Sequence, residues 1–120
     1  MSTIKANTLL HSDGTTTTQP SIPALDTRMA KAWVNFDGTG TITINDSYNV
    51  SSISDIGVGD FRYSLVVAMP SLSYITTCSA TYDTLGLSAP NSTSEVALTT
   101  KTVGGSAFDC IGVQSMVFGS

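Results

Sequence analysis

The residue types that carry catalysis are sparse in this chain of 120 residues. The single histidine, His11, precedes the turn sequence Ser12-Asp13-Gly14 and has no candidate partner nearby in the sequence. Cys78 and Cys110 each lack a second cysteine or a histidine at the spacing of a metal site. An enzyme needs a nucleophile with a base, a pair of tuned carboxylates or a metal. The sequence therefore predicts a protein that is not an enzyme and that uses no metal or cofactor.

The aspartates fall in or beside turn sequences. Asp55-Ile56-Gly57-Val58-Gly59-Asp60 offers oxygen ligands on a glycine-rich loop, which suits Ca²⁺, but its carboxylate spacing matches no known calcium loop. Aspartate is also favoured in turns because its side chain bonds to the local backbone. We therefore interpret this segment as a turn.

The best candidates for ligand contact lie in a stretch with little periodicity, residues 82–94. Tyr82, Asp83, Thr84 and Asn91 combine an aromatic face with hydrogen-bonding side chains, which is what a saccharide requires. Long irregular loops in compact domains are often functional. The alternative is that Tyr82 covers the core as a lid, and the sequence leaves both interpretations open.

An alternation of apolar and polar residues between glycine and aspartate clusters runs through most of the chain from Ala32 onward. Such a period of two is typical of half-buried antiparallel strands. Phe61, Tyr63, Leu65 and Val67 are expected on one face of the clearest core strand. The period of two also continues through Tyr48, Val50 and Ser52, and the last strand is expected from Cys110 to Phe118. About seven strands, with turns every eight to twelve residues, predict an all-β fold, an antiparallel, jelly-roll-like β-sandwich.

Residues 1–30 differ in texture, and we interpret them as an N-terminal arm that precedes a sandwich domain of residues 31–120. Thr3 to Leu10 has the pattern of a strand, Thr15 to Thr18 of an extended return, and residues 24–30 of a short helix. Pro20 and Pro23 impose an extended path between them. A floppy tail is the alternative to a docking arm. The side chains expected to dock on other subunits or proteins are Ile4, Leu9, Leu10, Ile22, Leu25 and Trp33.

Composition limits the partners. Only 12% of residues are charged, the net charge is −4, and the five basic residues are scattered, which argues against nucleic acid. No apolar run reaches the roughly 18 to 20 residues of a membrane span, and Met1 to Leu10 lacks the apolar centre of a signal peptide. We therefore expect synthesis in a reducing cytoplasm, with Cys78 and Cys110 as free, largely buried thiols.

Four segments carry a family resemblance: Lys31 to Thr41 (KAWVNFDGTGT), Asp46 to Ile53 (DSYNVSSI), the Asp55 to Asp60 turn and Ala68-Met69-Pro70. In this order they resemble a repeated module of bacteriophage tail-fibre and minor virion structural proteins, frequent in phages of marine bacteria and cyanobacteria. The resemblance covers roughly residues 30–75. The small-Met-Pro turn before Tyr74 is more loosely similar to H-type lectins and fibre tips.

The resemblance implies a non-enzymatic virion structural protein, assembled in the host cytoplasm as a homotrimer. It favours a tail-fibre or tail-tip component that attaches to other virion proteins by its arm and contacts host surface polysaccharide. A capsid decoration or head-fibre protein is the first alternative, since about thirty residues of arm lead directly into one module. A freestanding lectin-like binding module is the second.

Overall fold

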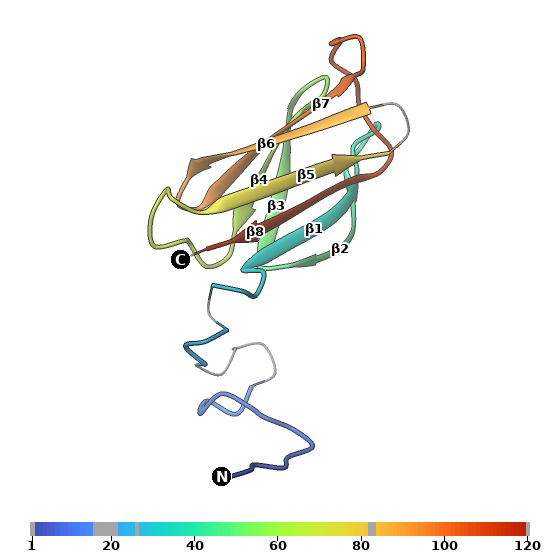
Figure 1. Cartoon of the computed structure of the whole chain (residues 1–120). Coiled ribbons are helices and arrows are strands. Elements are labelled where there is room, and N and C mark those ends of the chain that lie inside the picture. Colours follow the sequence, from blue (N-terminus) through green and yellow to red (C-terminus); the bar gives the residue numbers. More distant parts are fainter. Residues whose placement is uncertain (1, 16–21, 26, 82–83, 120) are drawn as a thin grey trace.

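The computed structural model describes residues 2–15, 22–25, 27–81 and 84–119, and its regular structure is entirely β (Figure 1). The predicted all-β fold is confirmed, with eight strands where about seven were expected. The strands are β1 (Ala32–Asp37), β2 (Thr43–Tyr48), β3 (Val50–Gly57), β4 (Asp60–Leu65), β5 (Ile75–Ala80), β6 (Thr84–Ser92), β7 (Glu95–Thr102) and β8 (Val113–Phe118).

The strands form two four-stranded antiparallel sheets that lie face to face as a sandwich (Figure 1). One sheet has the order β2-β1-β8-β5 and the other β3-β4-β7-β6. Each strand adjacent to the core alternates buried and partly exposed residues, as in Ala32, Val34 and Phe36 of β1. This alternation is the period-two pattern of the sequence, so each sheet presents one apolar face to the other.

Aromatic side chains from both sheets meet at the centre of the core. Phe36 of β1 and Phe61 of β4 pack edge to face with ring centroids 5.3 Å apart. The hydroxyl groups of Tyr63 and Ser115 hydrogen-bond across the sandwich at 2.8 Å, and both residues are buried. This bond satisfies two polar groups that would otherwise be costly to bury.

The buried Tyr63 makes stability depend on alkaline pH. Burial raises the pKa of Tyr63 to about 12, against an ordinary value of 10. Above pH 10 the unfolded chain releases this proton and the folded chain keeps it, so the stability present below pH 10 is lost as pH rises toward 12. From pH 9 to pH 11 we expect Tyr63 to remove about 1 kcal/mol from the free energy of unfolding.

Urea unfolding of the Tyr63→Phe variant measures this contribution. The variant starts about 1 kcal/mol less stable at neutral pH, because Ser115 loses its partner. Its further decline toward pH 11 should be shallower than that of the wild type. Burial raises the pKa of Cys78 to about 11, so Cys78 also lowers the free energy of unfolding over this pH range. It does so equally in both proteins. Parallel pH profiles for the two proteins would show that Tyr63 does not titrate as described.

Asn49 carries the chain from one sheet to the other. It has a φ of 58° and separates β2 from β3. Its side chain holds this corner, because Nδ2 donates to the carbonyls of Lys31 (3.1 Å) and Val67 (3.2 Å) and Oδ1 accepts from the Val67 N–H (2.8 Å). The expected unbroken strand through Tyr48, Val50 and Ser52 is therefore wrong at Asn49.

The opposite edge of the sandwich closes where β5 and β6 approach each other. The Thr76 hydroxyl donates to the Ser88 hydroxyl at 2.8 Å, and Gly86 lies directly against Cys78. The prediction of an irregular loop over residues 82–94 is wrong, since Thr84–Ser92 is a strand paired with β7. Gly86 and Pro90 are typical of loops, so the sequence pattern did not indicate a strand here. The structure tolerates both because β6 is an edge strand.

Two further expectations are wrong at strand ends. Val67 lies beyond the end of β4 and is 68% exposed, so it does not share the core face of Phe61, Tyr63 and Leu65. Its N–H bonds to Asn49 rather than to a neighbouring strand. The last strand begins at Val113 rather than at Cys110.

Candidate functional site

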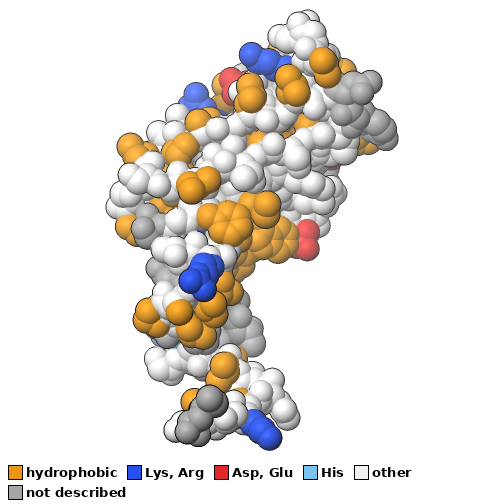
Figure 2. All heavy atoms as spheres, viewed as in Figure 1, with side chains coloured by type: hydrophobic (Ala, Val, Ile, Leu, Met, Phe, Trp, Pro, Cys, Tyr) orange, Lys and Arg blue, Asp and Glu red, His pale blue; other side chains and the backbone are white. Residues whose placement is uncertain are grey.

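The N-terminal arm is the most exposed part of the molecule, and it extends away from the sandwich (Figure 1). In its described residues, 2–15, 22–25 and 27–30, it has no strand and no helix. Five of the predicted docking side chains are exposed along it, led by Ile4 (88%) and Leu9 (66%); the others are Leu10, Ile22 and Leu25. Figure 2 shows hydrophobic side chains along the arm. The described part of the arm thus presents apolar groups to solvent.

Local backbone bonds shape the arm, and two predicted elements are corrected. Thr3 to Leu10 is not a strand, because no other described segment pairs with it. The described residues of 24–30 form turns and bends rather than a helix, with Leu25 N–H donating to the Ile22 carbonyl (2.9 Å) and Met29 N–H to the Leu25 carbonyl (3.1 Å). The predicted Thr15 to Thr18 segment lies largely outside the described residues.

His11 belongs to a turn within the arm. The Gly14 N–H donates to the His11 carbonyl at 2.8 Å, and Asp13 Oδ1 accepts from the Thr15 N–H at 2.8 Å. His11 Nδ1 lies 3.3 Å from Asp13 Oδ2. These contacts are those of a closed turn, which His11 helps to stabilise.

The junction of arm and sandwich is fixed. Lys31 N–H donates to the Val117 carbonyl at 2.7 Å, and the Lys31 carbonyl accepts from Asn49 at 3.1 Å. The arm therefore leaves from a defined point beside the start of β1 and the end of β8. A force on the arm is transmitted directly to the central strands of one sheet.

The predicted ligand-contact residues do not come together. Tyr82 and Asp83 lie outside the described residues. Thr84 and Asn91 occupy opposite ends of β6, about 23 Å apart along an extended strand. The Thr84 hydroxyl donates to the Thr81 carbonyl, and Asn91 Nδ2 donates to Glu95 Oε1. Ligand binding by these residues stays a prediction, but Thr84 and Asn91 cannot share one sugar ring.

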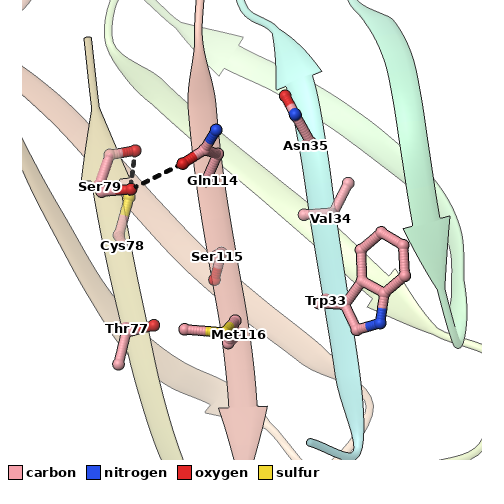
Figure 3. Close-up of a pocket in the computed structure, with 9 residues that line it drawn as sticks. All are labelled: Trp33, Val34, Asn35, Thr77, Cys78, Ser79, Gln114, Ser115 and Met116. Carbon is pink, nitrogen blue, oxygen red and sulfur yellow. Dashed lines mark hydrogen bonds between the residues drawn. The ribbon is translucent and has the colours of Figure 1, made fainter.

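Trp33 lies on the outer face of its sheet, at an open groove of about 500 Å³ (Figure 3). This groove, hereafter the β1–β8–β5 groove, is named for its three strands. Trp33 is partly exposed because it alternates with the buried Ala32 and Val34. Six outward-facing side chains line the groove: Trp33, Asn35, Thr77, Ser79, Gln114 and Met116. Sequence reasoning missed the groove, since it named Trp33 alone and assigned it to an interface.

The strand register orders the groove side chains into two rows. Trp33 is opposite Met116, which is opposite Thr77. Asn35 is opposite Gln114, which is opposite Ser79. The rows are two residues apart, or about 7 Å along the strands. One row is therefore mainly apolar and the other carries amides and a hydroxyl.

The two cysteines are free thiols in the structure, as predicted. Cys110 is buried beside a second, smaller cavity of about 370 Å³, with its Sγ 3.1 Å from the Thr81 hydroxyl and 3.4 Å from the Gly112 carbonyl. Burial raises the pKa of Cys78 to about 11, so this thiol is neutral at physiological pH. At Cys110 burial raises the pKa, but the hydrogen bonds with Thr81, Thr84 and Gly112 outweigh it and leave the pKa of this thiol below its ordinary value.

Two further kinds of site are absent from the described part of the chain. Among those residues, no three histidine, cysteine, aspartate or glutamate side chains gather as a metal site would require. Nor does the described chain contain a helix of the length and apolarity needed to cross a membrane.

The fold and its exposed features define a class: a two-sheet antiparallel β-sandwich with a protruding apolar arm and an aromatic groove on one sheet. No protein-family model, curated protein or solved structure matches the chain.

Proposed function

We propose that this chain is a non-enzymatic structural protein of a bacteriophage virion, a tail-fibre or tail-tip component that attaches by its N-terminal arm. The observation that carries the proposal is the set of exposed apolar side chains along the described residues of the arm. Fully burying one leucine or isoleucine side chain is worth about 1.5 to 3 kcal/mol. Ile4 and Leu9, at 88% and 66% exposed, can gain most of this free energy on docking, and the less exposed Leu10, Ile22 and Leu25 can gain a smaller part of it.

The sandwich complements this role. It holds the arm at a fixed junction through Lys31, and its weakly charged surface suits contact with further copies and other virion proteins. The resemblance of residues 30–75 to phage fibre modules supports assembly as a homotrimer. In this proposal the arm docks the subunit and the sandwich forms the exposed, host-facing part.

A capsid decoration protein is the second candidate. A tail fibre normally carries a shaft between its attachment end and its tip. Here only two residues separate Met29 in the arm from Ala32 at the start of β1, and this direct passage favours a compact capsid protein. The two locations differ in stoichiometry. A few threefold sets per particle indicate the tail, and hundreds of copies indicate the capsid.

Leu9→Asp tests the docking role in the full-length protein. Leu9 is 66% exposed and lies in the arm, so a charge there should leave the sandwich intact and weaken docking. Leu72→Asp is the matched control, since Leu72 is 59% exposed on a loop of the sandwich. We expect Leu9→Asp to reduce the copies per purified particle by about tenfold or more, equivalent to at least 1.4 kcal/mol.

The readouts are quantitative mass spectrometry of particles and the melting temperature of each isolated protein. Equal incorporation of Leu9→Asp, Leu72→Asp and wild type would contradict docking through the arm. Absence of the wild-type protein from particles, together with saccharide binding in solution, would identify the lectin-like alternative.

A further inference from the structure

We infer that the β1–β8–β5 groove binds a neutral saccharide chain, with the indole of Trp33 stacked against the face of a sugar ring. The inference rests on the proposed function, because it assigns the contact with host polysaccharide to a site. That site is the outer face of a sheet and not the segment around Tyr82. Four observations support it: an apolar row, a polar row, the size of the groove and its charge.

The apolar row supplies a platform for the carbon-bound hydrogens of a sugar ring. Trp33 lies between Met116 of β8 and Tyr48 of β2 in the strand register. Tyr48 and Met116 are 40% and 45% exposed. Figure 2 shows hydrophobic side chains gathered over β8, β1 and β2. One face of a pyranose is apolar, and such a face packs against an aromatic ring as other apolar groups do.

The polar row supplies partners for sugar hydroxyls. The Ser79 hydroxyl donates to Gln114 Oε1 at 3.3 Å (Figure 3), and Asn45 Nδ2 donates to Asn35 Oδ1 at 3.4 Å. Both contacts engage amide oxygens, which leaves the amide NH₂ groups of Gln114 and Asn35 oriented as donors. Amides and hydroxyls together both donate and accept, as sugar hydroxyls do.

The size and openness of the groove suit an extended ligand. A groove of about 500 Å³ lies within the range of roughly 300 to 1,000 Å³ for small-molecule sites. It lies across three strands of one sheet (Figure 3) and is open to solvent. A chain of sugars can lie along it, with rings over the apolar row and hydroxyl groups over the row about 7 Å away.

Charge selects the class of saccharide. The six outward-facing groove residues include no acid and no base. Asp46 lies opposite Asn35 on β2 in the strand register, and its charge repels anions. An acidic sugar or a phosphate would therefore lose its hydration without gaining a cation from the six groove residues, which is unfavourable. The groove accordingly favours neutral sugars.

Trp33 is the only tryptophan in the chain, so intrinsic fluorescence reports on this groove alone. The full-length protein is titrated with neutral hexasaccharides of glucose, mannose and galactose, and with hexagalacturonate as the acidic probe. We expect a saturable change in Trp33 emission with at least one neutral probe and none with the acidic probe. The Gln114→Ala variant should weaken that affinity at least about fivefold, near 1 kcal/mol.

Thr99→Ala is the matched control, because Thr99 faces outward on β7 of the other sheet. It should bind the sugar as the wild type does. The inference is overturned if no neutral probe changes the emission at concentrations up to roughly 10 mM, where even a probe with a millimolar Kd would be largely bound. It is also overturned if Gln114→Ala and Thr99→Ala give the same titration. Emission that shifts with protein concentration in the absence of sugar would instead identify the groove as an interface between copies.

Failure here is distinguishable from failure of the proposed function. The Leu9→Asp experiment measures attachment to particles and involves no groove residue. Normal attachment without sugar binding would leave a virion protein whose groove is not a glycan site.

Discussion

Replacing Gly59 by alanine is expected to lower the free energy of unfolding by about 4 kcal/mol or more, the range of backbone strain combined with steric overlap. Gly59 forms the turn between β3 and β4 and has a φ of 65°. A Cβ at this position would lie 2.3 Å from the Thr100 carbonyl oxygen and 2.8 Å from the Phe108 nitrogen. Both are backbone atoms, so neither can rotate out of the way.

Gly59 is also part of a hydrogen-bonded crossing that a shift would break. Its N–H donates to Asp109 Oδ1 at 2.7 Å, and its carbonyl accepts from the Thr100 N–H at 2.8 Å. The crossing ties the β3–β4 turn to the segment that follows β7. Moving the turn to relieve the overlap therefore costs two hydrogen bonds as well.

Gly40→Ala is the matched control, because Gly40 has a similar φ of 57° with nothing within 4 Å of the added Cβ. It isolates the cost of the left-handed backbone, about 1 kcal/mol. Urea unfolding of both variants gives the comparison. Equal losses of stability would show that the close approach of Gly59 to Thr100 is not present in solution.

The second large effect is expected at Gly86, where the edge strands of the two sheets meet. A Cβ there would lie 2.8 Å from Cys78 Sγ and 3.0 Å from the Cys78 carbonyl carbon and oxygen. Alanine must push β6 away from β5 and lengthen the bond between Thr76 and Ser88. We expect a loss of about 3 kcal/mol, at the upper end for overpacking.

Gly57→Ala provides the control for this prediction. Gly57 lies in β3, with no positive φ and with open space around it, so alanine should change stability by less than about 1 kcal/mol. Cys78→Ala combined with Gly86→Ala removes only the contact with sulfur and should recover less than half of the loss. A Gly86→Ala protein as stable as the wild type would mean that β5 and β6 do not close the sandwich.

Much of the fold was predictable because its central strands follow local rules. In β1, β4 and β7 apolar residues recur at every second position, so the sequence itself indicates which face is buried. β6 was not predictable in this way. Its glycine and proline resemble loop residues, and the reason for Gly86 is a contact with Cys78 on another sheet. The break at Asn49 was hidden because apolar alternation continues across it.

Of the two candidate sites, the arm was predictable from the sequence and the groove was not. The exposed apolar side chains of the arm were predictable from residue type. The strand predicted over Thr3 to Leu10 does not form, because a strand needs a neighbouring strand to pair with. The β1–β8–β5 groove depends on which strands are neighbours. Trp33, Gln114 and Thr77 become adjacent only through the order β1-β8-β5, and these residues are far apart in the chain. No local pattern contains that order.

Hydrogen exchange on assembled particles tests the central claim most directly, that the arm is the docking element. Amides of residues 2–15 are exposed in the isolated chain, apart from the turn at His11, and should exchange rapidly there. On intact particles the account predicts strong protection of these amides, with little change at β4 and β7. Rapid exchange of residues 2–15 on particles that carry the protein would contradict it.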